Sequence, residues 1–255
     1  MVEFVYADTL KRHYSVFGEF YRLDIGQQRL LCRRRVELVH TGQGAAEPLA
    51  LDIAKGSTPD AVAILMNPGG VRPSEDLDGF LNSLPLTHCY SRQDLTQSDT
   101  LHRLKPDNTQ YQLMRLMQAM GWNHLRLVNL SDLCDANSQS FARRLADLLE
   151  QHPSLPHSII DTARIADWQA LVGDAMLAGS FAIAAWGAPS VLEPQARECI
   201  QRLPSIIGVE QAFPWYRFAS PYRKDHKLEW LNTMLLKLTM PIAANSIGEK
   251  VNYSD

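Results

Sequence analysis

An asparagine stands at the end of each of two apolar runs of this chain. The first run stops at Asn67, with Pro68, Gly69 and Gly70 behind it, and another stops at Asn129. A carboxamide carries both a hydrogen-bond donor and an acceptor, so it can read the edge of a planar heterocycle such as a pyrimidine. Two successive glycines let a ligand or a water approach main-chain N–H groups closely. These residues predict a polar pocket for a planar, hydrogen-bonding ligand.

A second role stays open for these strand-end residues. Either asparagine can instead close its own strand end through side-chain bonds to nearby main chain. Asp132 follows Asn129 closely. It is either a catalytic carboxylate or a helix cap or solvated loop residue.

Two further apolar runs also end in polar or glycine residues. One ends in Trp186-Gly187, and the other in the segment Ser220-Pro221-Tyr222-Arg223. The basic segment YRKDHK at 222–227 has two interpretations. In one, the segment binds phosphates beside a base-binding pocket. In the other, it leads into the last helix with Asp225 as the N-cap. We expect Asp225 to be the N-cap, and the roles of Arg223, Lys224 and Lys227 stay open.

Short strands and amphipathic helices must position these residues. Apolar runs of four to six residues predict strands that are covered on both faces, and helical periodicity fills the gaps between them. This alternation predicts an α/β fold, a three-layer α/β/α sandwich around a central, mainly parallel four-stranded sheet. Ligands of such sheets bind beyond the carboxyl ends of the strands. The predicted strands are Ala61–Met66, Leu125–Asn129, Phe181–Trp186 and Trp215–Ala219, and the predicted helices lie within 107–122, 138–153, 163–179 and 225–240.

The N-terminal part has a different pattern. Residues 21–40 predict one or two extra antiparallel strands, an edge or a hairpin against the sheet, in which Arg33-Arg34-Arg35 is a solvated edge that discourages strand addition. Residues 41–60 indicate a loop-rich connection, and 84–106 a long irregular loop. We expect a single domain over 1–255, with a strand and loop extension at 1–60 and a core at 61–240.

Composition narrows the function classes. The net charge is −3 and the pI is near 6.2, so the strongly basic footprint of tight, sequence-independent nucleic-acid binding is absent, although a local basic patch stays open. The apolar runs are too short to span a bilayer, and the first residues lack the layout of a secretory signal. Four widely spaced cysteines favour free thiols over disulfides or zinc. We expect a cytoplasmic protein with no membrane partner, no metal and no cofactor.

Four motifs carry a resemblance to known families. The set LMNPGG (65–70), LRLVNLSDLCDANS (125–138), AAWGAPS (184–190) and RFASPYRKDH (217–226) resembles the uracil-DNA glycosylase superfamily. It resembles more closely domain of unknown function sixteen forty-three, an uncharacterised group of bacterial and phage proteins. Members of that group show Leu-Asn-Pro-Ser, Asp-x-Thr, Val-Asn-Leu and Ala-Trp-Gly, which correspond to residues 66–69, 107–109, 128–130 and 185–187.

The resemblance implies roles for particular residues. Asn67-Pro68 resembles the water-activating Asn-Pro of mismatch-specific glycosylases, and Asn129 their base-reading asparagine. Their last motif is His-Pro-Ser or Asn-Pro-Ser, whereas this chain has Ala219-Ser220-Pro221. Ser220 is a shorter and weaker donor toward the negative charge that develops on a leaving base. Asn67 can orient a water but cannot accept its proton.

Two hypotheses of function follow. The first is a glycosylase-like enzyme that recognises a nucleobase or nucleotide, free or in DNA, and acts at an N-glycosidic bond. The alternative is a non-catalytic module on the same fold that binds a nucleic acid or nucleotide. An interaction scaffold has no feature of its own beyond the 84–106 loop. The predicted catalytic residues are Asn67, Asp132 and Ser220, and the predicted substrate-binding residues are Pro68, Gly69, Gly70, Asn129, Trp186, Gly187, Tyr222, Arg223 and Lys224.

Overall fold

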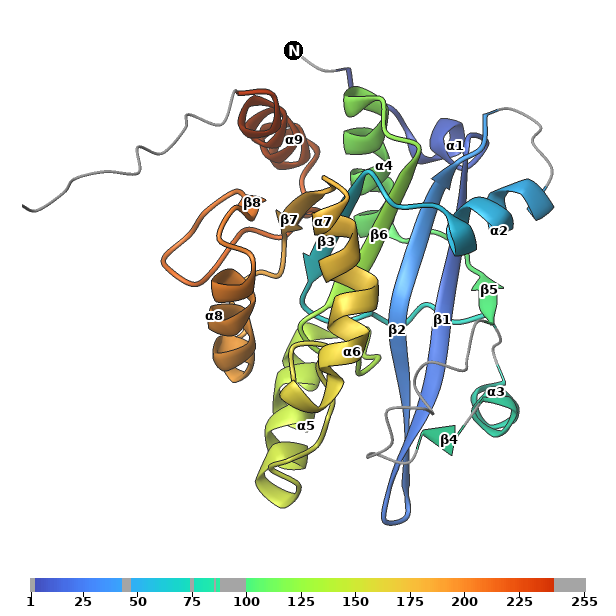
Figure 1. Ribbon diagram of the computed structural model, residues 1–255, viewed down its shortest axis with the longest axis vertical. Helices are drawn as coiled ribbons and strands as arrows, with labels where there is room; N and C mark the ends of the chain where they lie inside the picture. The colour runs from blue at the N-terminus through green and yellow to red at the C-terminus, as the bar shows by residue number, and fades with distance from the viewer. Residues whose placement is uncertain (1–2, 43–46, 74–75, 85, 88–99, 241–255) are drawn as a thin grey trace, which may run out of the picture.

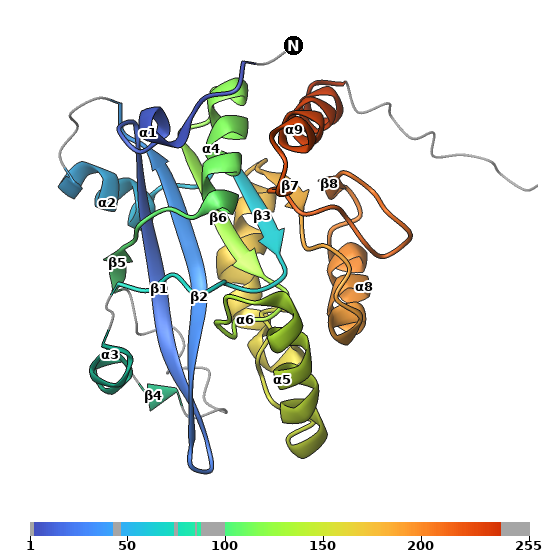
Figure 2. The ribbon, with the colours of Figure 1, turned by 180° about the vertical axis from the view of Figure 1, so that it is seen from behind.

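One mixed β-sheet with helices on both faces makes up the protein, an α/β fold (Figures 1 and 2). The computed structural model describes residues 3–42, 47–73, 76–84, 86–87 and 100–240. Within them, the sheet has eight strands in the order β4-β1-β2-β6-β3-β7-β8, and β5 pairs with β1. The strands are β1 (Tyr14–Ile25), β2 (Gln28–His40), β3 (Ala61–Leu65), β4 (Leu86–Thr87), β5 (Leu101–Arg103), β6 (His124–Asn129), β7 (Phe181–Ala184) and β8 (Ile207–Gly208).

Four neighbouring strands, β6, β3, β7 and β8, run parallel to one another. Their apolar residues are buried on both faces. Val62 and Ile64 contact the helices of one side, whereas Ala61 and Ala63 contact those of the other. The predicted strands beginning at Ala61, Leu125 and Phe181 are confirmed, to within two residues at each end.

The fourth predicted strand, Trp215–Ala219, is wrong. The fourth parallel strand is β8, whose two residues are too few to leave an apolar run in the sequence. Tyr216 forms only isolated bridges, with Gly187 and Glu210, and its ring packs edge-on against Trp186 at 5.1 Å between ring centres. The apolar character of this segment therefore reflects packing beside β7.

The predicted four-stranded sheet is wrong in size and type. The N-terminal strands β1 and β2 form an antiparallel hairpin, as the pattern indicated, but β2 also pairs antiparallel with β6. Residues 1–60 therefore build part of the sheet itself. Because Val36 to Val39 of β2 pair directly with His124 to Leu127 of β6, the hairpin reaches the carboxyl ends of the parallel strands.

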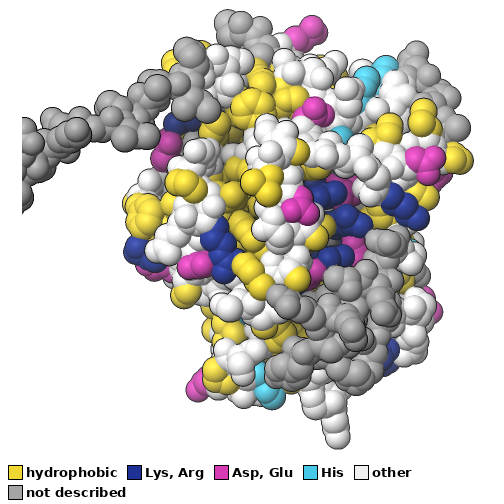
Figure 3. Space-filling view, viewed as in Figure 1, with side chains coloured by type: hydrophobic (Ala, Val, Ile, Leu, Met, Phe, Trp, Pro, Cys, Tyr) yellow, Lys and Arg dark blue, Asp and Glu magenta, His cyan; other side chains and the backbone are white. Residues whose placement is uncertain are grey.

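The prediction that Arg33, Arg34 and Arg35 form a solvated edge is also wrong. Their exposed fractions are 4%, 6% and 7%, because β2 lies between β1 and β6. Carboxylates on neighbouring elements compensate two of the charges. Arg34 and Arg35 pair with Glu19 at 2.9 and 2.7 Å, and Arg34 also pairs with Asp167. Figure 3 shows basic and acidic side chains gathered in a hollow over the β1–β2 hairpin.

Helices on opposite faces complete the two main cores. Helices α4 and α9 cover one face, and α5, α8 and the α6–α7 segment cover the other (Figures 1 and 2). The helices are α1 (Ala7–Leu10), α2 (Glu47–Gly56), α3 (Leu77–Ser83), α4 (Asn108–Met120), α5 (Ser138–Gln151), α6 (Ile165–Trp168), α7 (Asp174–Leu177), α8 (Glu193–Arg202) and α9 (Lys224–Thr239), with turns η1 (Thr162–Arg164), η2 (Gln169–Gly173) and η3 (Ser190–Leu192).

Helices α4, α5 and α9 confirm three of the helical predictions. The fourth, over 163–179, is interrupted by the π-helical turn η2, which contains the poor helix former Gly173. The connection 41–60 is not loop throughout, because α2 buries Ala50 and Ala54 against the hairpin. Pro48 lies in the first turn of α2, where proline is tolerated. Because proline usually interrupts a helix, the sequence did not indicate this one.

Asp225 is not the N-cap of α9. Arg223 occupies that position with an extended backbone. Asp225 lies in the first turn, where the positive end of the helix dipole stabilises its negative charge. Its carboxylate accepts from Arg223 Nε at 3.0 Å and from Nη2 at 2.5 Å.

The structure also bears on the expected absence of membrane spans and on the cysteines. In the part of the chain that the structure describes, no helix is long and apolar enough to cross a membrane. Cys32, Cys134 and Cys199 are free thiols, whereas Cys89 lies outside the described residues. Much of the 84–106 segment also lies outside them, and its described part includes β4 and β5.

Candidate functional site

A cavity of about 240 Å³ lies beyond the carboxyl ends of β3 and β6. We name it the amide cavity. Strand β2, the loop after β3, the start of α4, the end of β6 and the loop after it each contribute to its wall. It is lined by Arg33, Val36, Leu65, Met66, Asn67, Pro68, Gly69, Asp107, Thr109, Gln110, Leu127, Asn129, Asp135, Ala136, Ala185 and Phe218.

Asn129 brings an unsatisfied amide to the amide cavity. The residue is the last of β6, it pairs with Leu65 of β3, and its exposed fraction is 2%. Its Oδ1 atom is buried and has no hydrogen-bond partner among the described residues. Because a buried acceptor without a donor costs about 1–3 kcal/mol, this position is suited to a donor from a bound molecule.

Asn67 has a structural bond as well as a place in the cavity wall. Its Nδ2 donates to the main-chain oxygen of Asp135 at 2.9 Å and, more weakly, to that of Leu133 at 3.4 Å. Asn67 therefore has the structural role of closing its strand end, and it does so by binding the main chain of the loop after β6. Among the described residues no hydrogen bond reaches Asn67 Oδ1, which leaves this oxygen for a water or a ligand.

Arg33 is a wall residue that the sequence interpretation missed. Its Nη2 donates to the Pro68 oxygen at 2.8 Å and its Nη1 to the Val71 oxygen at 3.1 Å, so the hairpin holds the loop after β3. Burial lowers the pKa of the guanidinium. A charged residue inside an apolar strand was the available signal, but the three-arginine run suggested a solvent-facing edge.

The start of α4 supplies Asp107, Thr109 and Gln110 to the wall. Asp107 Oδ1 accepts from the Gln110 main-chain N–H at 2.8 Å, and Gln110 Oε1 accepts from the Asp107 N–H at 3.0 Å, which is a capping box. The Asp-x-Thr motif marked this helix start in the sequence. It gave no sign that the carboxylate would line the same cavity as Asn129, because that depends on how α4 packs on the sheet.

Asp135 is the second carboxylate in the wall. Its Oδ1 accepts from the Asn137 main-chain N–H at 2.9 Å and from Ser140 Oγ at 2.8 Å, at the start of α5. Asn137 is the N-cap of that helix. Asp135 therefore holds the loop after β6 in place while it faces the cavity.

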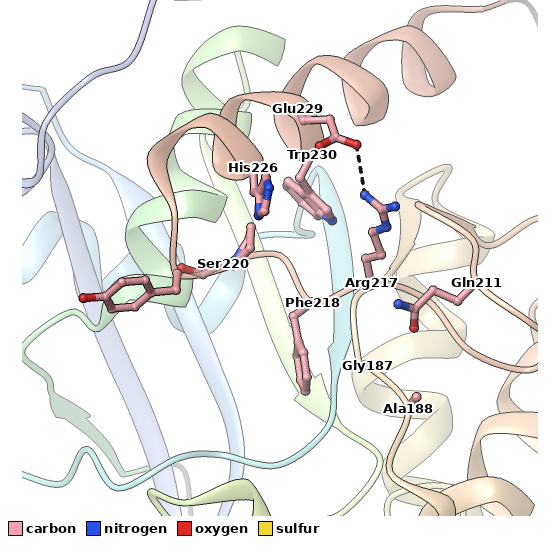
Figure 4. Close-up of a pocket in the computed structure, with 11 residues that line it drawn as sticks. Gly187, Ala188, Gln211, Arg217, Phe218, Ser220, His226, Glu229 and Trp230 are labelled. Atoms are coloured by element: carbon pink, nitrogen blue, oxygen red, sulfur yellow. Dashed lines mark hydrogen bonds and ion pairs between the residues drawn. The ribbon is translucent and has the colours of Figure 1, made fainter.

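A larger, open cavity of about 710 Å³ adjoins the first (Figure 4). We name it the aromatic cavity; its wall includes Gly187, Arg217, Phe218, Ser220, His226 and Trp230. Phe218 lines both cavities, and Arg217 pairs with Glu229 at 3.0 Å. Ser220 Oγ and Trp230 Nε1 are buried without a hydrogen-bond partner in the described part of the chain.

A third, shallow hollow of about 630 Å³ lies at the start of α9. We name it the basic hollow; it is lined by Asn108, Ser220, Pro221, Tyr222, Arg223, Lys224 and Lys227. Tyr222 is 99% exposed. Lys224 Nζ donates to Tyr6 Oη at 2.9 Å. Because Ser220, Pro221 and Tyr222 line both this hollow and the aromatic cavity, which shares Phe218 with the amide cavity, the three spaces adjoin.

Asp132 and Trp186 lie away from these spaces. Asp132 is fully buried, and its Oδ2 accepts from Tyr21 Oη at 3.0 Å and from Arg164 Nη1 at 2.5 Å. Burial raises the pKa of Asp132 to about 6. Trp186 is buried in the core, where its Nε1 donates to the Pro214 oxygen at 3.1 Å.

The structure thus brings together part of the predicted site. Gly70 serves close packing instead, since a Cβ there would lie 2.9 Å from Ala136 Cβ. The amide cavity contains Asn67, Pro68, Gly69 and Asn129; the aromatic cavity contains Gly187, Ser220 and Tyr222; the basic hollow contains Arg223 and Lys224; and Gly70, Asp132 and Trp186 line none of the three.

Comparison of the chain with protein-family models, curated proteins and solved structures finds no match.

Proposed function

We propose that the protein binds a nucleobase or nucleotide in the amide cavity and hydrolyses an N-glycosidic bond, in the manner of a DNA glycosylase. The buried, unpartnered Oδ1 of Asn129 carries this proposal. It needs a donor, and the ring N–H or amino group of a nucleobase supplies one. The volume of about 240 Å³ is below that of pockets for drug-sized ligands, and so suits a small planar ring.

The three adjoining spaces support a ligand larger than a free base. A base in the amide cavity would leave its sugar and phosphates near the aromatic cavity and the basic hollow. Arg223, Lys224 and Lys227 line that hollow, and basic side chains attract phosphates even on a chain of net charge −3. We propose the same placement for a nucleotide and for a base extruded from DNA.

Hydrolysis requires a water and a group that takes its proton. In the proposed step Asn67 Oδ1 orients the water, whose oxygen attacks C1′ of the sugar, and the C1′–N bond breaks with its electron pair leaving on the base. Asp107 takes the proton of the water. This carboxylate lines the same cavity, and one hydrogen bond reaches its Oδ1, whereas two reach Oδ1 of Asp135.

We propose that the motif resemblance also reflects kinship with the uracil-DNA glycosylase superfamily and with domain of unknown function sixteen forty-three. The motif residues at 67–70, 129 and 186–187 lie at or just after the carboxyl ends of β3, β6 and β7, three parallel neighbours, which supports this proposal.

A non-catalytic binding module is the second candidate. It is favoured by the placement of two of the predicted catalytic residues. Asp132 is held by Arg164 outside the amide cavity, and Ser220 lines the adjoining cavities instead. Such a protein would recognise a base through Asn129 and release no product.

One experiment separates the two candidates. The protein is incubated with duplexes that contain uracil, a thymine mismatch or a hypermodified pyrimidine, and with free nucleosides, and released base is measured. The enzyme predicts product that disappears in Asn67→Ala and persists in the control Asn82→Ala, whose exposed side chain lies on α3. Binding without product supports the module, and neither binding nor product overturns both.

A further inference from the structure

Arg33 differs from most of the other buried arginines in the groups that lie next to its charge. Four of them have a carboxylate within 3.4 Å, whereas Arg33 pairs with none among the described residues. The paired arginines are Arg34, Arg35, Arg126 and Arg164. A buried charge without a counter-charge is unfavourable, so such positions are normally completed by a partner.

Arg115 provides an internal comparison. It is also buried without a carboxylate partner, but its guanidinium lies over the Phe4 ring at 4.0 Å and its Nε donates to the Val5 oxygen at 2.7 Å. The guanidinium of Arg33 is 5.9 Å from the ring of Phe20, and its Nε is buried without an acceptor among the described residues. Only Arg33 of these two lines the amide cavity.

A second donor lies in the same wall. Gly69 adopts a positive φ of 53°, directly after Pro68, and no hydrogen bond from its main-chain N–H is found among the described residues. Arg33 holds this loop through the oxygens of Pro68 and Val71. One side of the cavity therefore combines a cation, a free main-chain donor and the positive end of α4.

Among the described residues, no carboxylate near Arg33 forms an ion pair with it. Asp107 caps α4, and Asp135 accepts two hydrogen bonds at the start of α5. Asp132 pairs with Arg164. The neighbouring Cys134 is a neutral thiol at pH 7, because burial raises its pKa to about 12.

We propose that Arg33 and the Gly69 N–H form an anion subsite within the amide cavity, so that the heterocyclic ring itself carries an anionic group such as a carboxylate. This inference rests on the proposed function in placing the anionic group on a heterocyclic ligand. Asn129 would read the ring, and Arg33 would select the charged form of the ligand by charge-assisted hydrogen bonding.

Matched ligand pairs test the subsite by isothermal titration calorimetry. Uracil is compared with uracil-6-carboxylate, and uridine with uridine 5′-monophosphate, so that the two arms distinguish an anion on the ring from a phosphate on the sugar, which would lie near the basic hollow. We expect uracil-6-carboxylate to bind wild-type protein about 10- to 100-fold more tightly than uracil. In Arg33→Gln this ratio should fall to about 1.

Two further variants control for folding and general charge. Arg33→Lys keeps the charge and should retain part of the ratio, with an unchanged circular dichroism spectrum. Arg29→Gln changes an exposed arginine of the same strand and should leave the ratio as in wild type. Equal affinities of charged and neutral ligands for wild-type protein, or an equal loss of both in Arg33→Gln, would overturn the subsite.

The outcomes separate this inference from the proposed function. If neutral bases bind through Asn129 with no preference for charge, the subsite is wrong and base recognition stands. If inorganic phosphate binds wild-type protein but not Arg33→Gln, while no heterocycle binds, the anion subsite stands and base recognition is wrong.

Discussion

Asn67 Nδ2 donates to the main-chain oxygen of Asp135 over 2.9 Å, so the residue that follows β3 holds the loop that follows β6. The carboxyl ends of two parallel neighbours are joined by this bond, and both residues line the amide cavity. The geometry of the cavity thus depends on a bond that a purely catalytic role for Asn67 would not need.

Asn67→Asp should therefore destabilise the fold. The carboxylate cannot donate, and it would face the two main-chain oxygens that Nδ2 now contacts. We expect the free energy of unfolding in urea to fall by about 1–3 kcal/mol. The control Asn82→Asp, whose Oδ1 accepts from Arg29, should leave stability close to wild type. Equal stability of Asn67→Asp and wild-type protein would show that this bond does not hold the loop.

Asp107 and Asp132 should behave differently when each is changed to asparagine. Asp107 lines the amide cavity, so Asp107→Asn should reduce hydrolysis by about 10²–10⁴-fold with little change in base binding. Asp132 is buried against Arg164, so Asp132→Asn should lower stability and leave the rate of the folded enzyme near wild type. Base-release kinetics and urea unfolding measure the two effects. The reverse pattern would move the catalytic carboxylate back to Asp132.

His157 should make stability depend on pH. It is 1% exposed, its Nδ1 lies 3.0 Å from Ser131 Oγ, and burial lowers its pKa to about 4. The unfolded chain binds this proton near pH 6.5. Between pH 6.5 and 4 the unfolded state therefore holds more protons, and stability decreases as the pH is lowered. The loss reaches about 3 kcal/mol at pH 4.

Unfolding in urea at pH 7 and pH 4.5 measures this contribution. His157→Gln should lose less stability over this interval than wild type, whereas the exposed control His152→Gln should lose as much as wild type. An identical loss in His157→Gln would mean that His157 does not resist protonation in the folded state.

Gly187 is required by its backbone and by its neighbour. Its φ is 72°, and a Cβ there would lie 2.4 Å from the ring of Phe218, which separates the amide and aromatic cavities. Gly187→Ala should lower the free energy of unfolding by at least about 1–2 kcal/mol and weaken base binding, because the ring must move. Gly56→Ala, where no atom lies within 4 Å, is the control. Stability is measured by thermal unfolding and base affinity by calorimetry. If Gly187→Ala and Gly56→Ala both had the stability and base affinity of wild-type protein, the expectation would be wrong.

The sequence predicted the buried strands β3, β6 and β7 and the helices α4, α5 and α9, because each is long or apolar enough to leave a periodic pattern. It also predicted that Asn67 and Asn129 line one space, since both end neighbouring parallel strands. The two-residue strand β8 and the short helix α2 left weaker patterns and were missed.

Charges that pair across strands are not visible in a single sequence. Arg34 and Arg35 looked solvated because their partner Glu19 lies on the other strand of the hairpin. The sequence also did not place Arg33 or Asp107 in the same cavity as Asn129. Their positions follow from the pairing of β2 with β6 and from the packing of α4, which are tertiary properties.

Calorimetric binding of a panel of free nucleobases and nucleosides to wild-type protein and Asn129→Ala tests base recognition most directly. We predict that at least one compound binds wild-type protein and that Asn129→Ala weakens its binding by about 10-fold or more. The exposed control Asn123→Ala, just before the same strand, should bind as wild type does. Absence of binding to wild-type protein, or equal affinity for Asn129→Ala, would contradict the assignment of the amide cavity to a nucleobase.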